Sequence, residues 1–160
     1  MSDRLDLIDR ILGRNLDWVA AADGKVAPIL AMDTAMLGVM AALVPSASSW
    51  RAVPAIMAGM ASICLLVSLI CLGAATFPRL HGPKESLVFF GGITTVERSK
   101  YVERLLAVPP QEIHEDFAEQ VHRNAEIAAT KFGFVRTAMV FLFAAIPFWL
   151  VAIGLLYAGR

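Results

Sequence analysis

A short segment between two apolar runs has the residue types of a site for an anion and a nucleotide base. Residues 83–97 read PKESLVFFGGITTVE, in which a strand-like run enters Gly91-Gly92 and a helix is expected to begin soon after. Backbone N–H groups at a helix N-terminus favour a bound anion such as phosphate, and aromatic rings can stack on a base. The residues that we expect to form this site are Arg79, Lys84, Phe89, Phe90, Gly91, Gly92, Thr94, Arg98, Lys100 and Tyr101.

The same segment is also compatible with two plainer structures. It could be a packing strand with a permissive turn, or an interfacial loop whose aromatic rings lie among lipid headgroups.

The sequence does not support a metal site, a phosphate loop or a catalytic nucleophile. His114 and His122 lack the i,i+4 spacing of a helical zinc pair, Gly24-Lys25 is not a phosphate loop, and no nucleophile is paired with a base. We therefore expect no metal, no cofactor and no enzymatic activity.

Asp33 is a lone acid within a run of apolar residues. Ionisable residues inside a bilayer usually face protein or water and mark function, so Asp33 is a candidate for a polar interhelical contact or a pore lining. Lys25 lies eight positions earlier, on the same helical face, and is the second candidate. The alternative is that Asp33 lies at a shallower depth, hydrogen-bonded to Thr34 or to a neighbouring helix.

The composition is that of a membrane protein. Of 160 residues, 58% are hydrophobic and 18% are charged, and the net charge is zero, which gives no indication of a nucleic-acid partner. Residues 52–77 and 137–158 contain no charged side chain, and residues 26–44 contain only Asp33. About 20 apolar residues cross a bilayer as a helix, so the sequence predicts three spans. The expected fold is an all-α integral membrane protein whose mainly helical cytoplasmic segment contains one short strand-like piece.

The predicted order of segments follows from these runs. An amphipathic helix over residues 1–25 precedes the spans at 26–44 and 53–77, which a loop at 45–52 joins. Residues 78–136 form a sensing or interaction segment, and residues 137–158 form the third span. Lys and Arg are concentrated in residues 1–25 and 78–136, so the positive-inside rule places both segments in the cytoplasm and the C-terminus outside. In a bacterium this corresponds to the inner membrane.

Two apolar stripes are expected in the cytoplasmic segments. One runs through residues 5–19 and the other through residues 113–135, where it continues into the third span as one long helix. The stripes could pack on each other within one chain or on copies in a homo-oligomer. Thr94 and Glu97 have the spacing of a capping box, which predicts a helix from about Thr95 to Ala107.

Several short motifs, in order, resemble the Pycsar transmembrane effector family. They are AADGKVAPIL at 21–30, SLVFFGGI at 86–93, a tyrosine at 101, and FAEQVHRNAEIAATKFGFV at 117–135, which leads into the final span. The resemblance covers residues 17–155. Gly92 is a departure, because the family often has an acidic residue after the first glycine.

The resemblance implies a role in antiviral defence. A partner cyclase would make cyclic CMP (cCMP) or cyclic UMP (cUMP) during phage infection, and the membrane effector would respond by impairing the inner membrane, so that the infected cell dies. Two other functions stay open from the sequence: a holin-like pore former that needs no signal, and a membrane scaffold subunit of a larger complex.

Overall fold

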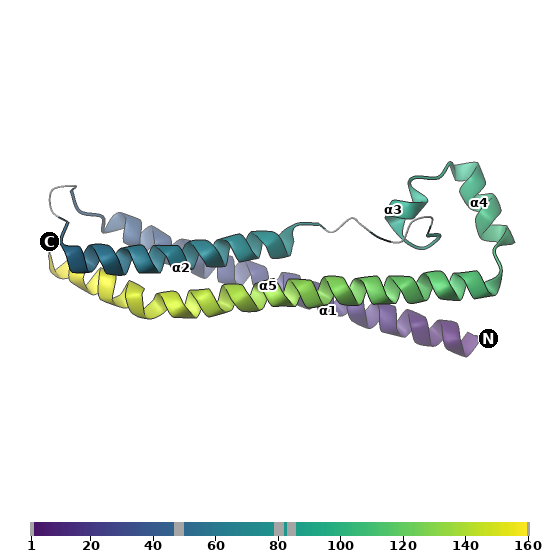
Figure 1. Ribbon diagram of the computed structural model, residues 1–160, viewed down its shortest axis with the longest axis horizontal. Helices are drawn as coiled ribbons and strands as arrows, with labels where there is room; N and C mark the ends of the chain where they lie inside the picture. Colours follow the sequence, from purple (N-terminus) through teal and green to yellow (C-terminus); the bar gives the residue numbers. More distant parts are fainter. Residues whose placement is uncertain (1, 47–49, 79–81, 83–85, 160) are drawn as a thin grey trace. The chain divides into compact units, whose positions relative to one another are not determined.

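The computed structural model describes residues 2–46, 50–78, 82 and 86–159, and its regular structure is helical (Figure 1). The helices are α1 (Ser2–Ala42), α2 (Ala52–Thr76), α3 (Phe90–Ile93), α4 (Arg98–Ala107) and α5 (Pro110–Ala158). This confirms the predicted helical fold. The described part contains no strand, so the predicted strand-like piece is wrong for residues 86–90, and residues 83–85 lie outside the described part.

Three helices are long and apolar enough to cross a membrane, namely α1, α2 and α5. α2 has 25 residues, close to the length of one span, whereas α1 has 41 and α5 has 49. Since about 20 residues cross the hydrocarbon core, α1 and α5 each contain a span and continue beyond it. The predicted N-terminal amphipathic helix and first span are therefore one helix, and α5 is the predicted single helix that leads into the third span.

The contacts of the chain form two units. The polar unit consists of Met1–Ala21 and Pro78–Thr130, and the membrane unit consists of Ala22–Phe77 and Lys131–Arg160. α1 and α5 contribute residues to both units. The borders predicted for the spans at residues 26, 44, 137 and 158 stay predictions.

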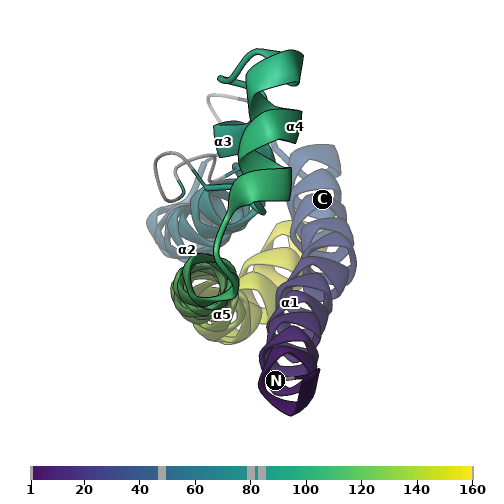
Figure 2. The ribbon, with the colours of Figure 1, turned by 90° about the vertical axis from the view of Figure 1, so that its right-hand side faces the viewer.

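In the membrane unit, α1, α2 and α5 pack around an apolar core (Figure 2). α1 and α5 run in the same direction, and α2 runs in the opposite direction (Figure 1). Trp149 on α5 donates a hydrogen bond from Nε1 to the carbonyl oxygen of Met36 on α1, at 2.9 Å. The buried core residues come from all three helices: Ile29, Cys64, Leu65, Leu72, Ala75, Val135, Ala138, Leu142 and Ala145.

In the polar unit, the first half of α1 contacts the first half of α5. The Asn15 side chain donates a hydrogen bond from Nδ2 to the carbonyl oxygen of Val121, at 3.0 Å. Asn15 and Val121 belong to the two predicted stripes, so this contact supports their packing on each other within one chain. Packing on further copies stays a prediction.

The predicted capping box is wrong. α4 begins at Arg98, and its N-cap Glu97 makes no side-chain capping bond. Thr94 is instead the C-cap of α3, where its hydroxyl donates to the carbonyl oxygen of Gly91 at 3.3 Å, and the Thr95 hydroxyl donates to that of Gly92 at 2.7 Å. The threonines therefore satisfy the end of α3 and are not available to the start of α4. The end of α4 at Ala107 is as predicted.

Candidate functional site

The segment with the motif SLVFFGGI is a bend followed by the short helix α3. Three N–H groups that a strand would offer to a neighbouring strand are bound by side chains. The N–H groups of Leu87 and Val88 lie 2.7 and 3.2 Å from Oδ2 of Asp116, and that of Phe89 lies 2.8 Å from the hydroxyl oxygen of Ser86. These side-chain acceptors explain why the segment is not extended.

Asp116 on α5 is the centre of this arrangement. Its second carboxylate oxygen, Oδ1, accepts a hydrogen bond of 2.6 Å from the Ser86 hydroxyl. The Gln120 side chain lies one turn later on α5 and donates to the same hydroxyl oxygen at 3.4 Å. Ser86 and Gln120 are 6% and 4% exposed, so water does not compete for these bonds. We call Ser86, Asp116, Gln120 and the backbone of residues 87–89 the Ser86–Asp116 network.

Tyr101 ties α4 to the same segment. Its phenol donates a hydrogen bond of 2.9 Å to the carbonyl oxygen of Leu87, from 14 positions further along the chain. The predicted site residue Tyr101 is therefore brought next to the SLVFFGGI motif, with its hydroxyl engaged in holding the loop.

Gly92 is required by a close approach of two backbone segments. A Cβ atom at this position would lie 2.8 Å from the carbonyl oxygen of Ser86 and 3.0 Å from its nitrogen. Contacts this short exclude any side chain unless the backbone shifts. Gly92 thus lets α3 pack on Ser86, and this packing role is independent of any bound anion.

The two phenylalanines of the motif have different surroundings. The Phe89 ring lies against Gly82 and Gly91, where a Cβ atom at either glycine would collide with it. Phe90 is 59% exposed, with its ring centroid 4.8 Å from that of Phe89 and tilted by 54°. Phe90 is therefore the ring of this loop that is open to a stacking partner.

The structure describes two of the four positively charged residues that were predicted for this site. Arg98 is exposed at the start of α4, and Lys100 lies 3.7 Å from the exposed carboxylate of Glu97. Arg79 and Lys84 lie outside the described residues. The Tyr101 hydroxyl is thus bound to the segment that contains Phe90, Gly91, Gly92 and Thr94, and Arg98 is the first residue of α4.

Within the membrane unit, Asp33 on α1 is fully buried and accepts a hydrogen bond of 2.7 Å at Oδ2 from the Ser68 hydroxyl on α2. Its other oxygen, Oδ1, is buried without a hydrogen-bond partner. The predicted polar contact between helices is present, and its role in a pore stays a prediction. Such a group is costly in a bilayer and is most often retained for function.

Lys25 and Asp33 are not brought together. The Lys25 ammonium lies over the ring of Phe132 on α5, 4.9 Å from the ring centroid, which is a cation–π contact. Close by in sequence, Asp23 on α1 pairs with Lys131 on α5, whose Nζ lies 2.7 Å from Oδ2, and Lys131 is only 9% exposed. These two contacts hold α1 to α5 at the charged end of the membrane unit.

The sequence analysis missed the Ser86–Asp116 network and the Asp23–Lys131 pair. The available signal was that Asp116 and Gln120 are spaced i,i+4 and share one helix face. Among the residues that the structure describes, no three His, Cys, Asp or Glu side chains form a group that could hold a metal.

The fold and these contacts define a helical membrane protein with three candidate spans and a polar unit built on two of the same helices. A model of the family described as Pycsar effector protein domain matches residues 7–158. The chain therefore belongs to this family, and it is a membrane effector of the Pycsar antiphage system. No curated protein and no solved structure matches the chain.

Proposed function

We propose that a cyclic pyrimidine nucleotide, cCMP or cUMP, activates this effector, and that the active form impairs the inner membrane of an infected cell. The nucleotide would come from a partner cyclase, and the death of the cell would stop the phage. Family membership supports this function. The observation that carries its mechanism is the Ser86–Asp116 network, which joins the SLVFFGGI loop to α5, the helix that also contains the third candidate span.

The proposed ligand surface is the exposed side of this loop. Phe90 would stack on the pyrimidine base, and Arg98 would attract the cyclic phosphate. Gly91 and Thr94 flank Phe90, and Tyr101 holds the loop from α4. The positive charges of Arg79 and Lys84 would add to the attraction for the phosphate.

The free energy needed for activation can be compared with the energy of the hydrogen bonds in the Ser86–Asp116 network. Raising an active form from 1% to 99% takes about 5.5 kcal/mol of differential binding. Hydrogen bonds to a charged group contribute roughly 1.5–3 kcal/mol each, and Asp116 accepts three of them from the loop. A ligand that strengthens or releases these bonds would therefore act on α5 with a free energy of the required order.

At the membrane end, Asp33 and Ser68 are proposed to separate when the effector opens. The bond between them joins α1 and α2 inside the core, and an opened bundle would expose the Asp33 carboxyl to a water-filled path. Lys25 would change its contact with Phe132 in the same step. We expect the active form to be a homo-oligomer, with the N-terminus in the cytoplasm and the C-terminus in the periplasm.

Titration calorimetry of the full chain in detergent, with cCMP and with cUMP, tests the ligand. One of them should bind, and Phe90→Ala should weaken binding by about 5-fold to 150-fold, because base stacking contributes roughly 1–3 kcal/mol. The control is Leu106→Ala, which removes a side chain that is 83% exposed on α4 and should leave binding unchanged. If neither nucleotide binds, the proposal is wrong, and a pore former without a signal or a scaffold becomes the better account.

A further inference from the structure

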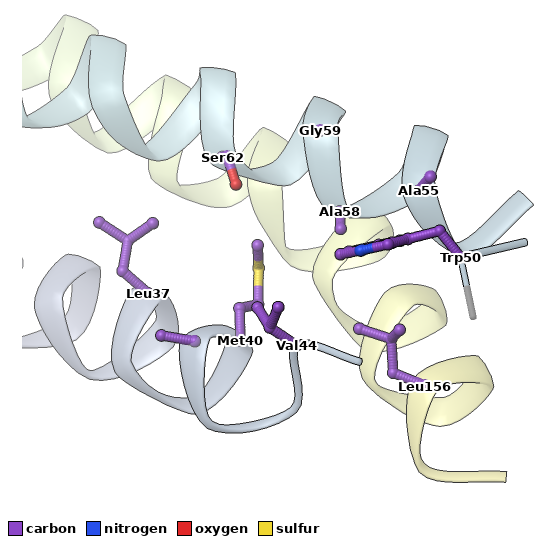
Figure 3. A pocket seen from close by; sticks show the side chains of 10 residues that line it. Leu37, Met40, Val44, Trp50, Ala55, Ala58, Gly59, Ser62 and Leu156 are labelled. Carbon is purple, nitrogen blue, oxygen red and sulfur yellow. The ribbon is translucent and has the colours of Figure 1, made fainter. Parts of the chain in front are cut away.

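An open cavity of about 550 Å³ lies at the surface of the membrane unit, between the end of α1, the start of α2 and the end of α5 (Figure 3). Leu37 and Ser62 lie toward one end of it, and Trp50 and Leu156 lie toward the other. The Trp50 indole extends over Ala58, beside the connection between α1 and α2 (Figure 3). This volume is within the range of small-molecule sites, which is roughly 300–1,000 Å³.

The lining determines the chemistry of the occupant. Nearly all of its side chains are aliphatic or aromatic, Ser62 carries its one hydroxyl group, and no lining residue is charged. A nucleotide or another ion would find no partner there, and water is unstable in an apolar cavity of this kind. The occupant must therefore be apolar.

The charges near the cavity indicate which apolar molecule this is. Arg51 adjoins Trp50 and is the only cation among described residues 34–77 and 137–159, which contain no acidic side chain. In a symmetric pair of chains, equivalent residues lie at the same depth, so a second copy would add another Arg51 and no acidic side chain from described residues 34–77 and 137–159. A phospholipid provides both an apolar chain for the cavity and a negatively charged phosphate for Arg51. Tryptophan is also typical of the headgroup level.

We propose that an acyl chain of a phospholipid occupies this cavity, with its phosphate beside Arg51. The lipid comes from the leaflet at the connection between α1 and α2. It covers the open side of the bundle at that end, beside the buried cluster of Met40, Ala58, Ala61 and Ala152 that packs the three helices together. This site is independent of the nucleotide and of the Ser86–Asp116 network.

Two glycines of α2 allow a matched test. Gly59 lines the cavity, and a Cβ atom added there meets nothing within 4 Å, so Gly59→Leu fills the space without a backbone collision. Gly73 lies on the same helix, is equally open around its Cβ position and does not line the cavity. Gly73→Leu therefore has the same effect on helix propensity and none on the cavity.

The probe is phosphatidylglycerol with a photoreactive diazirine on its acyl chain, mixed into vesicles that contain the full-length protein. After irradiation, labelled peptides are located by mass spectrometry. The lining at residues 37–44 and 55–62 should be labelled more than the peptide around Ile70, which is 70% exposed on the outer face of α2. Gly59→Leu should reduce labelling of the lining by about tenfold, the change expected from a loss of 1.4 kcal/mol of affinity, and Gly73→Leu should not.

A headgroup comparison tests the role of Arg51. Diacylglycerol with the same diazirine should label the lining about fivefold less than phosphatidylglycerol, and Arg51→Gln should remove this difference. Equal labelling in the Gly59→Leu and Gly73→Leu proteins would overturn the proposal. So would a change in oligomeric state in Gly59→Leu with unchanged labelling, because the cavity would then be a contact between copies. If Gly59→Leu does not fold, Ala55→Leu provides a second filling variant.

Discussion

Asp116→Asn is the substitution that tests the Ser86–Asp116 network most sharply. It preserves the shape of the side chain and removes its charge and one of its two oxygen acceptors. The three groups that Asp116 binds are all donors in the structure: the hydroxyl of Ser86 and the N–H groups of Leu87 and Val88. Asparagine can keep its oxygen toward the two N–H groups only by turning its own N–H₂ toward Ser86.

The expected cost follows from these bonds. A hydrogen bond to a charged acceptor contributes roughly 1.5–3 kcal/mol and a neutral one roughly 0.5–1.5 kcal/mol, so each bond that is kept weakens by about 1 kcal/mol. The bond from Ser86 is lost or reversed. We expect the free energy of local opening at residues 86–89 to fall by about 2–4 kcal/mol, allowing for both contributions.

Hydrogen exchange measured by mass spectrometry reports this local opening directly. The amides of Leu87, Val88 and Phe89 should exchange about 30-fold to 1,000-fold faster in Asp116→Asn, since 1.4 kcal/mol corresponds to a factor of ten. The control is Glu115→Gln, which neutralises the neighbouring exposed carboxylate and should change exchange by less than about threefold. Unchanged protection in Asp116→Asn would show that the network does not hold the loop.

Two further substitutions test the packing. Ser68→Ala removes the hydrogen-bond partner of Asp33 and should lower the midpoint of thermal unfolding in detergent by about 2–8 °C, for a loss of about 1–2 kcal/mol. Ser62→Ala on the same helix is its control, and equal midpoints in the two variants would contradict the role of the buried bond. Gly92→Ala should raise exchange across residues 86–93, because its methyl group would lie 2.8 Å from the carbonyl oxygen of Ser86, at a cost of about 1–3 kcal/mol. Unchanged exchange there would mean that α3 does not depend on this close approach.

The sequence predicted the elements that depend on local composition. The charge-free run at residues 52–77 corresponds to α2, and the stripe that leads into the last span corresponds to the unbroken helix α5. Such features are visible because hydrophobic runs and helical periodicity are properties of neighbouring residues. The resemblance to the family was also correct, since the family model matches residues 7–158.

The parts that failed depend on partners far away in the sequence. Residues 86–89 have strand-like side chains, but the N–H groups of Leu87 and Val88 are bound by Asp116, almost 30 positions later. Lys25 and Asp33 share a helical face in the sequence, and the structure shows their contacts with Phe132 and Ser68 on other helices. The spacing of Thr94 and Glu97 fits a cap at the start of α4, whereas in the structure Thr94 is the C-cap of α3. The long-range partners Asp116, Phe132 and Ser68 cannot be identified without the tertiary arrangement.

The central claim is that a cyclic pyrimidine nucleotide converts this protein from a sealed form to one that breaches the membrane. The direct measurement is dye release from liposomes that contain the purified full-length chain, with and without cCMP or cUMP. Release should occur only with the nucleotide, and it should require a higher nucleotide concentration for Phe90→Ala than for Leu106→Ala. Equal release with and without both nucleotides would contradict the account.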